Sequence, residues 1–190
     1  MRARMALKYC GIKVKIHEVS LKDKPESMLK ISPKGQVPVL VTSDKKVIDE
    51  SMEIISFALS VSDPDGWLSP DEKTHQIMEE LIYINDTSFK ENLDKYKYFD
   101  KNQEISVEKC RAHGEEFLKI LESRLRKNKY LFGDKIHYGD IAIFPFIRQF
   151  AHVDKIWFYQ SPYQGLQQWL NDFLESKSFR EIMIKDLENL

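Results

Sequence analysis

Three absences limit what this chain of 190 residues can be. No apolar run reaches about 18 residues, so we expect no membrane-spanning helix. The formal net charge is only −1, which gives no electrostatic reason for binding to nucleic acid or to an anionic membrane. The spacing of the two cysteines, Cys10 and Cys110, fits neither a disulfide framework nor a metal site. Their small number and the lack of a recognisable signal peptide are typical of a cytoplasmic protein.

Motifs for several kinds of chemistry are also missing. The five histidines show no metal-ligand spacing with cysteine, aspartate or glutamate, so we expect no metal site. The sequence contains no glycine-rich phosphate loop and no Gly-x-Ser-x-Gly nucleophile elbow. These absences argue against nucleotide binding by such a loop and against hydrolysis by such a serine.

The most informative residues are Gln36–Leu40, with a proline at position 38, and the later sequence Asp49–Ser51. Because proline cannot donate to a strand ladder, Pro38 indicates an edge, a bulge or a cis turn, and it leaves backbone of Val37 free to bond something else. Ser51 opens a segment with helical apolar spacing, and the positive end of a helix suits a carboxylate. Taken singly, Pro38 also fits the end of a loop and Ser51 an ordinary N-cap. Together they indicate a site for a small peptide-like acid.

The surrounding pattern predicts alternating helices and strands in the first 60 residues. Apolar spacing, turn residues and the stop at Gly11 predict, in order, a helix over 1–10, a strand over 13–19, a helix over 25–31, strands over 37–41 and 46–48, and a helix from Ser51. Residues 61–70 contain two prolines and a glycine and are predicted to form a linker. The sequence therefore predicts an α/β domain over 1–60.

Residues 71–190 show helical spacing and no convincing strand, which predicts an all-helical domain. Helices are expected within 75–89, 104–127, 141–150 and 163–174. The segment 141–150 is apolar nearly all round, so it should be buried on every side, and Pro145 should disturb it or lie in its first turns. Asp140, at the start of this helix, is interpreted as a structural cap and not as a catalytic acid.

This order of elements closely resembles the cytosolic glutathione transferases, with an omega- or beta-like character. The matching pieces are residues 2–7, 21–26, 32–40 and 48–51, together with the 139–148 helix start. The resemblance implies a thioredoxin-like N-terminal domain, an all-helical substrate and dimerisation domain, and a homodimer. It also implies that Pro38 is cis, that Val37 pairs with the cysteinyl part of glutathione, that Glu50 and Ser51 hold its γ-glutamyl end, and that Lys24 lies near its glycyl carboxylate.

Members of this family begin with a strand and a loop that carries the catalytic Cys, Ser or Tyr. Here Met1 falls inside the following helix, so the resemblance implies an incomplete N-terminal domain without its first strand, and the catalytic residue is unknown. A start assigned too far downstream, a truncated chain and a naturally shortened protein all remain possible, and we favour the first two because an unpaired central sheet is unfavourable. With a cysteine, thiol exchange is expected, and with Ser or Tyr, conjugation. The alternative is a non-catalytic glutathione-binding or interaction module.

Overall fold

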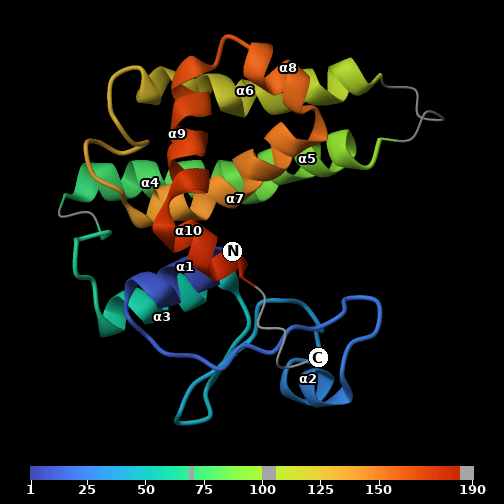
Figure 1. Cartoon of the computed structure of the whole chain (residues 1–190), viewed down its shortest axis with the longest axis vertical. Helices are drawn as coiled ribbons and strands as arrows, with labels where there is room; N and C mark the ends of the chain where they lie inside the picture. Colours follow the sequence, from blue (N-terminus) through green and yellow to red (C-terminus); the bar gives the residue numbers. More distant parts are fainter. Residues whose placement is uncertain (69–70, 100–105, 185–190) are drawn as a thin grey trace. The chain divides into compact units, whose positions relative to one another are not determined.

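The first structural unit is built around helix α1 (Arg2–Tyr9) and helix α3 (Ser51–Val61), which pack side by side. The computed structural model describes residues 1–68, 71–99 and 106–184 and divides into two units (Figure 1). The first comprises Met1–Asp65 with the segment that begins at Lys177, and the second comprises Gly66–Ser176. Residues 69 and 70 of the predicted linker lie outside the described residues.

The core of the first unit comes from one face of each of these helices. The apolar residues buried there are Met5, Ala6 and Leu7 from α1 and Ile54, Ile55, Ala58 and Leu59 from α3. Burial of such side chains contributes about 1.5–3 kcal/mol each relative to exposure. The predicted helices over 1–10 and from Ser51 are confirmed, as is the short helix before the sheet, α2 (Glu26–Ile31).

The described sheet is a two-stranded antiparallel hairpin of β1 (Leu40–Val41) and β2 (Val47–Ile48). Leu40 pairs with Ile48 and Val41 with Val47. Both predicted strands exist there but are shorter than expected. The predicted strand over 13–19 is wrong, since these residues form no strand. Alternation shows only that one face is apolar, whereas a strand also needs a partner, and none of the described residues pairs with this segment.

Helix α10 (Lys177–Met183) packs against α1 within the first unit, although the sequence prediction placed these residues in the helical domain. Lys8 Nζ lies 2.9 Å from Glu181 Oε2, and Arg4 Nη1 donates to the carbonyl oxygen of Ile182 at 3.3 Å. Contacts between residues more than 170 positions apart leave no local signal in the sequence.

The described elements of the second unit are helices, apart from an isolated β-bridge between Tyr130 and Gly133. Its elements are α4 (Glu72–Ile84), a π-helical turn η1 (Asn85–Phe89), α5 (Lys90–Lys97), α6 (Val107–Leu125), α7 (Tyr138–Val153), α8 (Lys155–Gln160) and α9 (Gln164–Glu175). Among the described residues, no helix combines the length and the apolar character that crossing a membrane would require. The predicted helices are confirmed, although the one expected over 104–127 is described only over Val107–Leu125 and residues 104 and 105 lie outside the described ranges.

Side-chain caps explain where three of these helices begin. Asp71 accepts the backbone N–H of Thr74 at 2.8 Å at the start of α4, and Asp154 accepts that of Trp157 at 2.9 Å at the start of α8. Ser106 Oγ accepts a longer bond, 3.4 Å, from a backbone N–H in the first turn of α6. Each cap satisfies one of the N–H groups that a helix leaves unpaired at its start.

Helix α7 is the centre of the second unit. Most of its residues are buried, as its apolar sequence predicted, and Pro145 lies in its interior without ending it. Aromatic side chains pack around it, with the rings of Phe144 and Phe173 centred 4.9 Å apart. At Gly114 in α6, a Cβ atom would lie 2.4 Å from Cε2 of Phe150, so only glycine permits this approach of α6 to α7.

Candidate functional site

The peptide bond between Val37 and Pro38 is cis, as the resemblance implied. Strand β1 begins only at Leu40, so Val37 lies ahead of the ladder and its side chain is 48% exposed. Within the described part of the chain, neither the N–H nor the C=O of Val37 takes part in a hydrogen bond. Exposed backbone groups without a partner in the chain can accept a peptide-like ligand by forming main-chain hydrogen bonds.

The N-terminus of α3 is the second feature of the site. Glu50 is the N-cap residue in an extended conformation, and no side chain caps the helix. The first N–H groups of α3 therefore lack an intrahelical acceptor and carry the positive end of the helix dipole. Arg2 adds a full positive charge, because this buried residue places Nη1 3.4 Å from Ser51 Oγ. These N–H groups and the guanidinium group of Arg2 are groups that can bind a carboxylate.

The hairpin register explains why these two features lie together. The pairs Leu40 with Ile48 and Val41 with Val47 define an antiparallel alignment. The same alignment continued backwards by three positions would set Val37 opposite Ser51, although the ladder itself ends at Leu40 and Ile48. That Val37 and the start of α3 form a single site stays a prediction.

A group of charged side chains borders the start of α3. Lys34 Nζ lies 3.3 Å from both Asp49 Oδ1 and Glu50 Oε1. The buried hydroxyl of Ser32 donates to Asp49 Oδ2 at 3.1 Å. Hydrogen bonds from Ser32 and then from Lys34 lower the pKa of Asp49, and hydrogen bonds to Asp49 and then Glu50 raise the pKa of Lys34. The carboxylate of Asp49 and the ammonium group of Lys34 are thus held in their charged forms.

Lys24 approaches the loop that leads to Pro38. Its Nζ lies 3.4 Å from the position that a Cβ on Gly35 would occupy, and Gly35 has a φ of +58°. A side chain at position 35 would be strained by that backbone conformation and would also crowd the lysine. The structure therefore places an exposed ammonium group beside the backbone segment that precedes Val37.

Sequence reasoning missed two of the charged residues at the site, Arg2 and Lys34. Arg2 lies in a different helix from Ser51, and Lys34 was treated only as part of a family motif, so neither was expected to contact the start of α3. For Lys34 the available signal was the acidic pair Asp49 and Glu50, with which a nearby lysine can pair, whereas the contact of Arg2 with Ser51 left no such signal. Neither cysteine has the surroundings of an activated nucleophile in this structure, since both are buried. For Cys10, burial and, to a smaller extent, the nearby charge of Asp63 raise the pKa of the thiol.

Asp140 has the structural role that the sequence predicted. It is fully buried and accepts hydrogen bonds from the backbone N–H groups of Leu131 at 2.9 Å and His137 at 3.1 Å, and from Trp169 Nε1 at 3.0 Å. Burial raises the pKa of Asp140 to about 6, and these hydrogen bonds oppose the rise. Because all its contacts are within the core, this carboxylate ties α7 and α9 to the preceding loop.

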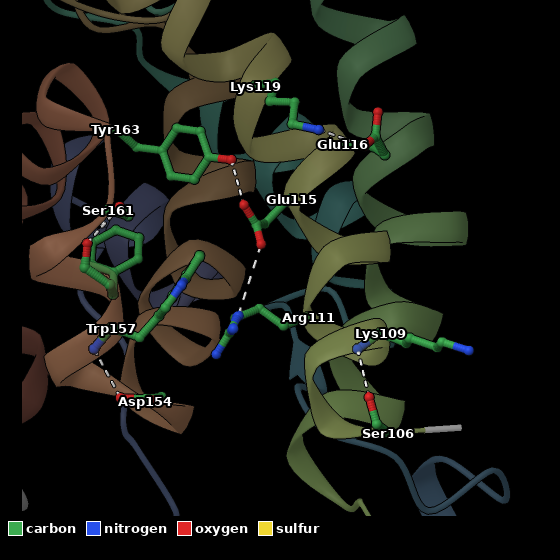
Figure 2. Close-up of polar contacts among 11 residues, drawn as sticks. Ser106, Lys109, Arg111, Glu115, Glu116, Lys119, Asp154, Trp157, Ser161 and Tyr163 are labelled. Atoms are coloured by element: carbon green, nitrogen blue, oxygen red, sulfur yellow. Dashed lines mark hydrogen bonds and ion pairs between the residues drawn. The ribbon is translucent and has the colours of Figure 1, made fainter. Parts of the chain in front are cut away.

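A second polar cluster in the same unit also serves packing (Figure 2). The hydroxyl of Tyr163 donates to Glu115 Oε2 at 2.7 Å, and Arg111 Nε lies 3.8 Å from Glu115 Oε1. The guanidinium group of Arg111 lies over the ring of Trp157 at 4.5 Å. Both oxygens of Glu115 are thus engaged, so we interpret this cluster as a tie between α6 and the α8–α9 segment. No group of three or more potential metal-ligating side chains occurs among the described residues.

Comparison with known proteins gives a consistent result. Residues 1–60 match the family described as "Glutathione S-transferase, N-terminal domain", and residues 104–172 match "Glutathione S-transferase, C-terminal domain". Glutathione S-transferase U22 of Arabidopsis thaliana is 30% identical over 158 residues, covering 82% of this chain and 71% of that protein. Elongation factor 1-gamma 3 of rice (Oryza sativa subsp. japonica) is 22% identical over 204 residues, covering 97% of this chain and 49% of that protein. The glutathione transferase URE2P6 of Phanerochaete chrysosporium, solved with oxidized glutathione, superposes with a TM-score of 0.79 at 18% identity, covering 95% of this chain and 88% of that one.

Proposed function

Because the chain belongs to the glutathione S-transferase family, we propose that it binds glutathione as a co-substrate and transfers it to a small electrophile or exchanges thiols with a disulfide. The binding residues in this proposal are Lys24, Val37, Pro38, Glu50 and Ser51. The observations that support it most are the exposed Val37, whose backbone has no hydrogen-bond partner among the described residues, and the start of α3, which no side chain caps.

Each part of glutathione has a matching group in the first unit. The cysteinyl residue presents a backbone N–H and C=O, which suit the free N–H and C=O of Val37. The γ-glutamyl carboxylate suits the N–H groups at the start of α3 with the Ser51 hydroxyl, and Arg2 supplies opposite charge nearby. The γ-glutamyl ammonium suits the carboxylate of Glu50, and the glycyl carboxylate suits the ammonium of Lys24.

The chemistry in this proposal depends on the ligand's thiol, which attacks efficiently only as a thiolate. In conjugation, the thiolate sulfur forms a bond to an electrophilic carbon, and the leaving group departs with its electron pair. In thiol exchange, the thiolate attacks one sulfur of a disulfide, a mixed disulfide forms, and the other sulfur leaves as a thiolate. The catalytic residue that would favour the thiolate is left unassigned, and so are the omega- or beta-like subclass and the second substrate.

The alternative proposal is a binding or interaction module without catalysis. One observation favours it, namely that a relative covering nearly the whole chain is named as an elongation factor subunit and not as a transferase. The same fold can carry different functions, so the two proposals share the binding site and differ only in chemistry.

The test begins with calorimetric titration of glutathione into the chain and into Glu50→Gln. Loss of the charged acceptor should weaken binding about 10- to 100-fold, because charge-assisted hydrogen bonds contribute about 1.5–3 kcal/mol. Glu26→Gln is the matched control, since Glu26 is an exposed glutamate of the same unit that pairs with Lys30. No binding to a folded chain, verified by circular dichroism, would refute both proposals.

Activity measurements then separate the two proposals. Conjugation of a chloronitrobenzene or reduction of a mixed disulfide in the presence of glutathione supports the transferase, whereas binding without either reaction supports the module.

The proposal further includes a homodimer, a cytoplasmic location, and a division into a glutathione domain (1–60), a linker (61–70) and a substrate and dimer domain (71–190). Gel filtration at the mass of one chain, 22.4 kDa, would contradict the homodimer.

A further inference from the structure

Glu50 is not free in this structure, although the proposed function requires its carboxylate to accept the ammonium group of glutathione. Lys34 Nζ lies 3.3 Å from Glu50 Oε1 and at the same distance from Asp49 Oδ1. Lys34 is thus shared between two carboxylates, of which only Glu50 belongs to the proposed binding residues. An ammonium group from a ligand would meet an ammonium group that is already there.

We propose that Lys34 competes with the ammonium group of the ligand for the carboxylate of Glu50. When the ligand binds, Lys34 releases Glu50 and stays paired with Asp49. This inference rests on the proposed binding of glutathione and concerns selectivity at the same site. It requires a second carboxylate that keeps Lys34 paired after Glu50 is released. Asp49 is suited to that role because the buried Ser32 hydroxyl donates to Asp49 Oδ2 at 3.1 Å and so holds this carboxylate in place. Asp49 therefore stays in place when Glu50 changes partner.

The charge balance explains what such a competitor does. Before binding, Lys34 neutralises Glu50, so a ligand without an ammonium group would leave this ion pair intact. A ligand with an ammonium group replaces the ion pair between Lys34 and Glu50 with its own ion pair to Glu50. It gains the full attraction of the Glu50 carboxylate only if Lys34 moves away. The side chains of Lys34 and Glu50 are each more than half exposed, so the lysine can move without unpacking the core.

The experiment compares two ligands with two variants of Lys34. The ligands are glutathione and glutaryl-cysteinyl-glycine, which lacks only the γ-glutamyl amino group. Lys34→Met removes the competing charge and should tighten glutathione binding by a factor of about 1.5 to 5, the range that exposed ion pairs span. Binding of the analogue should not tighten, so the ratio of the two dissociation constants should rise by the same factor. Lys34→Arg keeps the charge and should resemble the unaltered chain.

Lys30→Met controls for the loss of an exposed lysine elsewhere in the unit, because Lys30 pairs only with Glu26 among the described residues. If Lys34→Met binds glutathione equally or more weakly while Glu50→Gln still impairs binding, the inference is wrong and the proposed function stands. If glutathione binds neither to the unaltered chain nor to any of the variants, the proposed function fails and the inference fails with it.

Discussion

Replacing Gly114 with alanine sets two effects of opposite sign against each other. Gly114 lies inside α6, where alanine is the better helix former by about 1 kcal/mol. The added Cβ would however lie 2.4 Å from Cε2 and 3.0 Å from Cζ of the Phe150 ring. These distances are well inside van der Waals contact, so either the ring or the helix has to move.

The surroundings of Phe150 decide which effect is larger. The ring is only 1% exposed and lies 5.6 Å from the ring of Phe89, 5.1 Å from that of Tyr96 and 6.2 Å from that of Trp157. Because neighbouring rings surround it, the ring cannot rotate away into solvent. Overpacking of a core typically costs about 1–3 kcal/mol, and a contact this short belongs at the upper end. We therefore expect a net loss of about 1–2 kcal/mol in the free energy of unfolding.

Urea unfolding followed by circular dichroism measures this loss, and a double-mutant cycle assigns its cause. Phe150→Leu removes the ring atoms that the new methyl group would strike, so Gly114→Ala should be tolerated far better in that background. A coupling of at least 1 kcal/mol between the two substitutions is expected. If Gly114→Ala increases stability by the helix-propensity value, the approach of α6 to Phe150 is not as close as described and the reasoning is refuted.

Three further predictions concern stability and ligand binding. Asp140→Ala should lower the free energy of unfolding by about 2–4 kcal/mol in urea titrations, because three buried N–H groups lose their acceptor. Because Ser32 and Lys34 lower the pKa of Asp49, its stabilising effect should be present above about pH 4, the unfolded pKa, and be lost as pH falls. The stability difference between the chain and Asp49→Asn should therefore shrink from pH 6 to pH 3, and a constant difference would contradict this. Glutathione at 100 times its dissociation constant should stabilise the chain by about 2.7 kcal/mol, visible as a rise in melting temperature, and no shift at saturation would contradict binding to the folded state.

The helices were predictable because their apolar spacing and end signals are local. Gly11 marks the end of α1 in the sequence and adopts a φ of +68° in the structure. The apolar segment 141–150 is buried in α7 as its composition requires. The cis bond before Pro38 was predictable for a different reason, since it came from the resemblance of a short motif to a known family and not from spacing.

What could not be predicted depends on partners that are distant in the sequence. Alternating residues over 13–19 resemble a strand, but no sequence pattern tells whether a neighbouring strand is present to complete the ladder. Helix α8 was not predicted, because its six residues are too few to show a periodicity and, unlike those of α2, do not follow a proline. The contact of Arg2 with Ser51 joins two helices across 49 positions and follows only from the packing of α1 on α3.

The contrast between buried and exposed polar groups explains why we place ligand binding in the first unit. In the second unit, the carboxylates of Asp140 and Glu122 are buried and accept hydrogen bonds from backbone N–H groups of the chain itself. A buried group without a partner, such as Asn85 Oδ1, lies where no ligand can reach it. Val37 combines the two properties, because its backbone has no hydrogen-bond partner among the described residues and the residue is 48% exposed. Exposed backbone groups that the chain does not pair with its own residues can exchange water for a peptide-like ligand, which then gains main-chain hydrogen bonds that the folded chain does not supply to itself.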